Sequence, residues 1–164
     1  MIQKKSLKKA KYNRIKCEVC WHDFYFPYTG SIYFNNIPKV CSVDCFLFLL
    51  FNFEYDMTLE KISEIAVSEN KTFSCFRSEY EEDFAIFLSN NGISFYYEPF
   101  VFRVEDGLSY TPDFLLYHNL IFFEIKGIWE PKSKRKFLSF IKNIGLPIYL
   151  IDGLFLDFLK RGKW

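Results

Sequence analysis

The chain of 164 residues has no apolar run long enough to cross a membrane and no visible secretory signal. Its most apolar stretch, Leu47–Phe53, is far shorter than the ~20 residues that a membrane-spanning helix needs. The N-terminus is basic but is not followed by the apolar segment of a signal peptide. We therefore expect no membrane partner and a cytoplasmic protein, whose thiols are reduced or metal-bound.

The sequence also lacks internal repeats, low-complexity linkers and a large net charge. Its length and its 50% apolar content suit one ordinary core with a small appended module. The net charge of +1 conceals an uneven distribution, with basic residues 1–16 and 126–164 around a mainly acidic stretch at 54–106. This pattern favours a phosphate-binding surface around a cation site, although a solvated tail and an ordinary mixed surface would give the same charges.

Four of the five cysteines form two closely spaced pairs, Cys17-x-x-Cys20 and Cys41-x-x-x-Cys45. Two thiolate pairs with this spacing can complete one tetrahedral, structural Zn²⁺ site. Disulfides are the alternative, which a cytoplasmic location disfavours. We expect a short β-hairpin region between the pairs and a helix over Phe46–Phe53 beside the metal.

The role of this predicted zinc finger stays open. The basic chain before it could clamp a DNA backbone, or the metal could simply stabilise an N-terminal module that is too small to fold alone. Cys75 is expected to be a small buried residue, and His22 an ordinary surface residue. The candidate DNA-binding residues at this end are Lys4, Lys5, Lys8, Lys9, Lys11 and Arg14.

The most informative segment places two acids and a lysine among apolar residues. Asp113 follows Pro112, which fixes the backbone and suits a strand start or a bend. Residues 120–125 read as a buried strand interrupted by Glu124, and burying an uncompensated carboxylate costs about 2–5 kcal/mol. Glu124 and Lys126 project from the same face of a strand. Two carboxylates and an ammonium converging at one sheet edge would suit a divalent-metal phosphodiesterase site.

Hydrophobic periodicity and turn signals predict the order of elements in the rest of the chain. Ser78 and Glu81 form a capping box that opens a helix through Leu88, which stops at Asn91-Gly92. The order of elements predicts an α/β domain with a mixed sheet. The other expected elements are a helix at 57–68, strands at 93–98, 100–104, 110–117 and 120–126, a basic helix at 134–143, a strand at 147–151 and a helix at 154–160.

Pro112-Asp113 followed by Glu124-x-Lys126 resembles the signature of PD-(D/E)xK nucleases. The resemblance extends to the phage endonuclease I family of Holliday-junction resolvases and covers roughly residues 77–140. The Pro-Asp and Glu-x-Lys elements are weak alone, whereas the full string is specific. The matching residues are Ser78 and Glu81, Gly92-Ile93, Tyr97-Glu98, Tyr110 to Leu116, and Glu124-Ile-Lys-Gly-Ile-Trp-Glu130.

The resemblance implies a DNA endonuclease that depends on Mg²⁺ or Mn²⁺ and has a restriction-endonuclease-like mixed β-sheet core flanked by helices. Glu81, Asp113 and Glu124 match the family's metal-binding carboxylates, and Lys126 matches its catalytic lysine. We expect residues 1–53 to form the basic tail and the four-cysteine zinc module, 54–76 a linking helix, and 77–164 the nuclease domain. The protein would act on DNA as a homodimer or higher homo-oligomer in a bacterial or phage-infected cell.

Each candidate has a structural alternative. Glu81 could serve only in the capping box, Asp113 only in a turn, and Glu124 with Lys126 as a surface pair on an edge strand. The added zinc module leaves open a site-specific homing or restriction-type endonuclease, and also a non-catalytic zinc-bearing DNA-binding protein. A further basic group, which could equally be a solvated helix face, is a candidate for phosphate contacts: Lys132, Lys134, Arg135 and Lys136.

Overall fold

The computed structural model describes residues 11–28, 36–70, 75–105 and 107–162. The chain begins with a hairpin of β1 (Lys11–Lys16) and β2 (Asp23–Tyr28). Helices α1 (Val43–Asn52) and α2 (Leu59–Ile65) follow, then the short strand β3 (Ser68–Glu69). In these ranges, no helix combines the length and the apolar character that spanning a bilayer requires.

The second half alternates helices with strands. Helix α3 (Glu79–Asn90) precedes five strands, β4 (Phe95–Tyr97), β5 (Phe100–Glu105), β6 (Leu108–Tyr110), β7 (Phe114–Leu116) and β8 (Phe122–Lys126). Helix α4 (Pro131–Asn143), strand β9 (Ile148–Asp152) and helix α5 (Gly153–Arg161) complete the chain.

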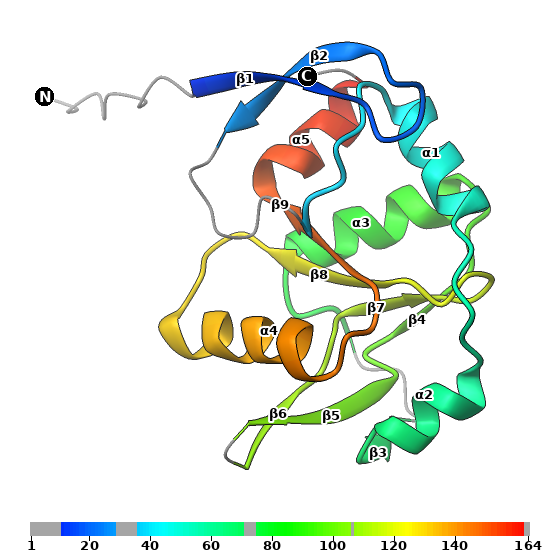
Figure 1. Ribbon diagram of the computed structural model, residues 1–164, viewed down its shortest axis with the longest axis vertical. Helices are drawn as coiled ribbons and strands as arrows, with labels where there is room; N and C mark the ends of the chain where they lie inside the picture. The colour runs from blue at the N-terminus through cyan, green and yellow to red at the C-terminus, as the bar shows by residue number, and fades with distance from the viewer. Residues whose placement is uncertain (1–10, 29–35, 71–74, 106, 163–164) are drawn as a thin grey trace, which may run out of the picture.

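The central sheet has the order β4-β7-β8-β9, with β8 and β9 parallel and the other pairs antiparallel. Strands β3, β5 and β6 form a second, antiparallel sheet. Figure 1 shows α3 and α5 on one side of the central sheet and α4 on the other. The mixed α/β architecture expected from the sequence is therefore confirmed.

Neighbouring phenylalanines of β8 make both layers of the core, because successive side chains of a strand point to opposite faces. Phe123 packs against Phe84 of α3, and Phe122 packs against Phe140 of α4. Phe46 of α1 joins the first layer, with its ring 4.9 Å from that of Phe155 in α5. The first helix of the cysteine-containing region thus contributes to the core of the α/β part.

Three expected elements differ from the structure. The strand expected at 110–117 is two strands in different sheets, because Pro112 has no amide proton for a ladder and the chain bends there. The helix expected at 57–68 ends at Ile65, and Ser68 begins β3 instead. A hairpin was expected between the two cysteine pairs. The observed hairpin of β1 and β2 instead has the first pair, Cys17 and Cys20, in its connecting turn, and residues 29–35 lie outside the described part.

The expectation for Cys75 is wrong, because its side chain is exposed. The next residue, Phe76, occupies the inward position and packs against Tyr97 and Phe114. Adjacent residues of an extended segment point in opposite directions, so burying the larger phenylalanine turns the thiol toward solvent.

Candidate functional site

Strand register brings three acids together at one end of the central sheet. Phe114 of β7 pairs with Phe123 of β8, so Asp113 lies beside Glu124. On the other side of β7 the amide of Glu98 donates to the carbonyl of Asp113 over 2.7 Å. The acids therefore meet at the end of interior strands. The expectation that these residues lie on an edge strand of the sheet is wrong, because β8 lies between β7 and β9.

Asp113, Glu124 and Lys126 form a connected group in this position. The side chain of Glu124 is only 3% exposed and that of Asp113 9%. The ammonium of Lys126 donates to Glu124 Oε1 over 3.0 Å, and the hydroxyl of Tyr110 donates to Glu124 Oε2 over 2.5 Å. The Ile125 amide donates to Asp113 Oδ2 over 2.7 Å. This burial and position rule out a surface pair on an edge strand.

Burial controls the ionisation of this group. Desolvation, reinforced by the charge of Glu124, raises the pKa of Asp113 well above its usual value. Desolvation also raises the pKa of Glu124, although Lys126 and Tyr110 oppose the rise. Burial alone would lower the pKa of Lys126, but the neighbouring carboxylates outweigh it and raise this pKa. The lysine is therefore an ammonium at neutral pH, next to carboxyl groups that resist losing their protons.

Glu81 occupies the capping box at the start of α3. The hydroxyl of Ser78 accepts from the Glu81 amide over 3.2 Å and donates to Glu81 Oε1 over 2.9 Å. Glu81 Oε2 accepts from the Arg77 amide over 2.8 Å and from the Tyr97 hydroxyl over 2.5 Å. Glu81 raises the pKa of Asp113 through its charge, so the two carboxylates interact. However, Glu81, Asp113 and Glu124 are not among the described groups whose ligand atoms all lie within 4.8 Å of one another.

Glu98 is a further buried acid beside this group, to which the sequence analysis assigned no role. Its backbone has φ of +46°, a left-handed conformation that is rare outside glycine and costs about 1–3 kcal/mol. Its Oε2 accepts from Arg77 over 2.7 Å, whereas its buried Oε1 has no partner among the described residues. Burial raises the pKa of Glu98. The sequence pattern included Tyr97-Glu98, but it did not indicate the left-handed backbone of Glu98.

An aromatic ring lies against the backbone that follows Lys126. A Cβ on Gly127 would meet Tyr80 Cε2 at 2.2 Å, and one on Gly153 would lie 3.6 Å from the Tyr80 hydroxyl. Tyr80 thus fits a notch between two glycines and remains 43% exposed. Lys126 Nζ lies 5.6 Å from the centre of the Trp129 ring. Trp129 thus lies beside the lysine, and Tyr80 lies against the glycine that follows it in the chain.

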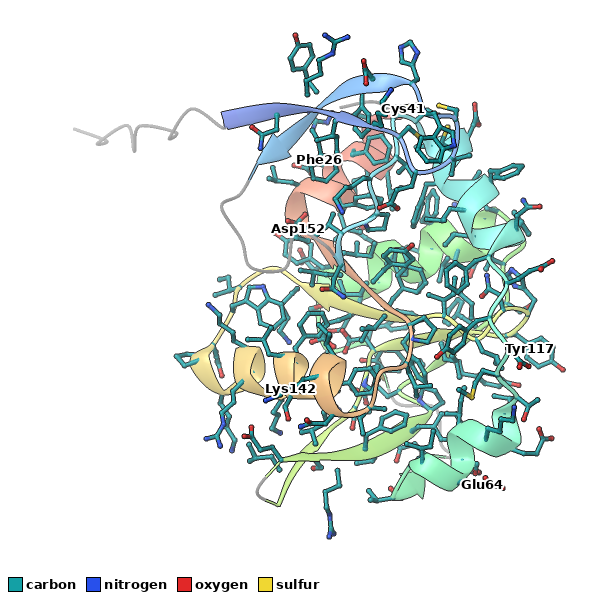
Figure 2. All side chains as sticks on the ribbon, viewed as in Figure 1. Phe26, Cys41, Glu64, Tyr117, Lys142 and Asp152 are labelled. Atoms are coloured by element: carbon teal, nitrogen blue, oxygen red, sulfur yellow. The ribbon has the colours of Figure 1, made fainter. Side chains whose placement is uncertain are left out.

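The four paired cysteines form a second cluster. Their sulfur atoms all lie within 4.8 Å of one another, with Cys20 Sγ 3.5 Å from Cys41 Sγ and Cys41 Sγ 3.7 Å from Cys45 Sγ. Four sulfurs bound to one zinc at about 2.3 Å in a tetrahedron lie about 3.8 Å apart. All are free thiols, and Cys41 is labelled in Figure 2, at the end of the hairpin beside α1. The cluster therefore has the composition and size of a four-thiolate metal site.

The candidate DNA-binding residues divide into two groups. Arg14 lies on β1 and is paired with Asp23 over 2.8 Å, whereas Lys4, Lys5, Lys8, Lys9 and the side chain of Lys11 lie outside the described residues. Lys132, Lys134 and Arg135 are exposed on α4, and Lys136 is half-buried. Lys134, Arg135 and Lys142 border a cavity of about 460 Å³ beside Glu105. Figure 2 labels Lys142 near the end of this helix.

The fold and these two clusters define a mixed α/β protein with a buried carboxylate–lysine site and a group of four cysteines that could hold a metal. A model described as Phage endonuclease I matches residues 62–145, just over half of the chain. The chain therefore belongs to the phage endonuclease I family. The match includes Glu81, Asp113, Glu124 and Lys126. It begins after the four clustered cysteines, which lie outside it.

Two curated relatives share one segment with this chain. The chain is 45% identical over 67 residues to Endodeoxyribonuclease 1 of Enterobacteria phage T3, covering 38% of this chain and 43% of that protein. It is 43% identical over 67 residues to Endonuclease I of Escherichia phage T7, covering 38% of this chain and 44% of that protein. The chain thus spans less than half of the length of these relatives.

Proposed function

We propose that this protein is a divalent-metal-dependent endonuclease that hydrolyses phosphodiester bonds of DNA. The observation that carries the proposal is the convergence of Asp113, Glu124 and Lys126 at the end of buried strands. A fold gains no stability from two acids placed there without compensation. The names of the T3 and T7 relatives, an endodeoxyribonuclease and an endonuclease, point to the same activity.

The residues present fit a Mg²⁺ or Mn²⁺ ion. Such hard cations prefer carboxylate oxygens, and Asp113 and Glu124 supply them in a site poor in competing ligands. Asp113 Oδ2 is held by the Ile125 amide, while Asp113 Oδ1 accepts no hydrogen bond from a residue that the structure describes. A bound cation would offset the desolvation that raises both acid pKa values, and would supply an acidified water and charge stabilisation at phosphorus.

The protein's own groups orient this chemistry. Tyr110 fixes one Glu124 oxygen and Lys126 contacts the other, so the carboxylate has one orientation. The raised pKa of Lys126 supports electrostatic stabilisation of the phosphoryl group rather than proton abstraction. We propose Glu81 as the third metal carboxylate, which requires it to exchange its contacts with Tyr97 and the Arg77 amide for the ion.

The finer assignments belong to the same proposal. We propose a PD-(D/E)xK, restriction-endonuclease-like domain over 77–164, a linking segment at 54–76, and a zinc module over 1–53 with Cys17, Cys20, Cys41 and Cys45 as ligands. The preferred substrate is a branched junction, cut by a homodimer or higher oligomer in the cytoplasm of a bacterial or phage-infected cell. The exposed lysines of α4 would contact phosphates.

A site-specific homing or restriction-type endonuclease is the second candidate. It is favoured by the cysteine cluster, which lies outside the family-matched residues and would add DNA contacts to a catalytic domain. A non-catalytic DNA-binding protein is the third candidate, although the buried acids and Lys126 would then have no function.

Cleavage assays separate these candidates. Wild-type protein is incubated with supercoiled plasmid, a synthetic four-way junction and linear duplex, each with Mg²⁺, Mn²⁺ or EDTA. We expect metal-dependent cleavage, which Asp113→Asn abolishes and Asp83→Asn, a surface acid paired with Lys160, retains. Selective cutting of the junction supports the resolvase, and one discrete site in a long duplex supports the homing enzyme. No cleavage with either metal, or full activity of Asp113→Asn, contradicts the proposal.

A further inference from the structure

The hairpin above the cysteine cluster has two different faces. Cross-strand partners share a face, and the register pairs Arg14 with Tyr25 and Ile15 with Phe24. The inner face carries Ile15, Phe24 and the buried Phe26, which is labelled in Figure 2 beneath the hairpin. The outer face carries Arg14, Lys16, Asp23 and Tyr25, all of which are exposed.

Two large aromatic side chains, Trp21 and Tyr25, are exposed on this hairpin. Tyr25 is 67% exposed in the middle of the outer face. Trp21 is 72% exposed at the turn, directly after Cys20. Its backbone has φ of +61°, and its amide donates to the Cys17 carbonyl over 3.2 Å. A bulky residue rarely adopts this conformation, so the turn holds the indole outward at a cost in backbone energy.

The charge around these rings suits an anionic partner. Arg14 and Lys16 both contact Asp23, at 2.8 and 3.6 Å, so two cations face one acid on the outer face. In the sequence, Lys4, Lys5, Lys8 and Lys9 precede this strand without an intervening acid. Basic side chains beside flat, exposed rings are the combination that binds single-stranded nucleic acid, through phosphate contacts and base stacking.

We propose that Trp21 and Tyr25 stack on unpaired DNA bases while Arg14 and Lys16 contact the adjoining phosphates. The inference rests on the proposed function and deepens it, since it names the structural feature of the substrate that the cysteine module recognises. In duplex DNA the flat faces of the bases are stacked on one another, so they are not accessible for stacking with Trp21 and Tyr25. Strand ends, flaps and opened branch points expose those faces.

A metal ion on the cysteine cluster would make this surface rigid. Trp21 follows Cys20 directly and its amide donates to the Cys17 carbonyl, so the turn that carries the indole lies between two of the four proposed ligands. Stacking side chains that are held in position lose little conformational entropy on binding. The surface lies on the β1–β2 hairpin, which contains none of Asp113, Glu124 and Lys126 and lies outside the residues matched by the family model.

Fluorescence anisotropy tests the proposal with zinc-loaded full-length protein and three labelled probes: a 20-nucleotide oligothymidine, a 20-base-pair duplex and a four-way junction with an unpaired arm. Metal for cleavage is omitted, so binding is measured alone. We expect Trp21→Ala to weaken oligothymidine binding about tenfold and the double variant with Tyr25→Ala about a hundredfold. Duplex affinity should change less than threefold, and Trp21→Phe should restore most of the binding to oligothymidine.

Tyr117→Ala is the matched control, since Tyr117 is 59% exposed, lies away from the hairpin in Figure 2, and should leave all three affinities unchanged. Zinc content and circular dichroism check that each variant is folded. Unchanged oligothymidine binding by Trp21→Ala, or an equal loss for duplex and oligothymidine, overturns the proposal. Cleavage assays report on the proposed function separately, because Trp21-dependent binding without Mg²⁺-dependent cleavage would sink the nuclease and leave this inference standing.

Discussion

The two candidate metal sites differ in what holds their ligands in place. Asp113 and Glu124 are adjacent through strand register and are fixed by hydrogen bonds from the Ile125 amide and Tyr110. The four thiols come from a hairpin turn and from the segment that leads into α1, and their sulfurs have weak mutual contacts and a Val19 amide on Cys17 Sγ. The fold therefore builds the acid site at an electrostatic cost, whereas we propose that the cysteine site depends on a bound metal for its stability.

The thiol pKa values agree with this contrast. Burial opposes ionisation of Cys17, but backbone N–H groups near Cys20, Val19 and Cys41 outweigh it and lower its pKa to about 7. Burial and the neighbouring thiols raise the pKa of Cys41 to about 12. Within the cluster, Cys17 thus ionises readily without a cation, whereas Cys41 resists ionisation. A zinc ion would remove this resistance, since thiolates are its ligands.

Removing zinc is the change with the largest expected effect. Structural zinc sites contribute an apparent binding energy of about 10–16 kcal/mol, so a zinc-selective chelator should unfold the hairpin locally. We expect β1 and β2 amides to lose hydrogen-exchange protection while the Ile125 amide of β8 retains it. Cys75→Ser should still bind one zinc per chain, and Cys41→Ser should not. A hairpin that stays protected in the chelator would break the comparison between the sites.

The second effect concerns the acid site alone. Lys126→Gln removes the cation from Glu124 and should lower Mg²⁺-dependent cleavage about 10²–10³-fold, the usual loss when a transition-state donor is removed. Zinc content should remain one per chain, because the cysteine cluster does not depend on this strand. Lys61→Gln, at an exposed position on α2, is the control for the general loss of one positive charge. An equal loss of cleavage in both variants would mean that Lys126 contributes only its general positive charge and no specific contact with the phosphoryl group.

The third effect tests the notch beside the lysine. Gly127→Ala places a methyl group 2.2 Å from Tyr80 Cε2, so the ring must leave the notch. Overpacking of this kind costs about 1–3 kcal/mol in unfolding free energy. Tyr80→Ala should tolerate the second change, so the double variant should be more stable than the sum of the two single losses predicts. Additive losses in chemical denaturation would show that the ring does not depend on this glycine.

The sequence predicted the elements that carry Glu81, Glu124 and Lys126 because strands and helix caps follow local rules. Alternation placed Glu124 and Lys126 on one face, Pro112 marked the chain bend, and Ser78 with Glu81 marked the start of α3. Only the family resemblance grouped Glu81 with Asp113 and Glu124, because hydrophobic periodicity does not relate a helix residue to residues of distant strands. The pairing of Cys17 and Cys20 with Cys41 and Cys45 was likewise readable from spacing.

The rest required the three-dimensional structure. Sequence patterns gave no reason to divide 110–117 between two sheets, because the partner strands that decide this are distant in the chain. The left-handed backbone of Glu98 and Trp21 depends on the hydrogen bonds around each residue. The notch at Gly127 depends on where α3 packs against β8. These features combine distant segments, and local propensity does not record them.

The smallest effect isolates the electrostatic cost of the acid site. Because burial raises the pKa of Asp113, the metal-free folded state holds this proton more tightly than the unfolded chain does. Both states are protonated below pH ~4, so there is no difference there. As pH rises, the unfolded chain ionises first, and the metal-free wild type loses stability. Asp113→Asn keeps an oxygen for the Ile125 amide and avoids this loss.

We therefore expect Asp113→Asn to melt a few degrees above the metal-free wild type at pH 8, where about 1 kcal/mol corresponds to roughly 2–4 °C, and closer to it at pH 4. Saturating Mg²⁺ should reduce the difference in melting temperature at pH 8, since only the wild type has the Asp113 carboxylate that binds the ion. Asp83→Asn is the control, because that acid is partly exposed and paired with Lys160. A melting difference independent of both pH and Mg²⁺ would mean that the Asp113 carboxylate carries no electrostatic cost, and that the acid site is stabilised by its own contacts alone, in contrast to the cysteine site.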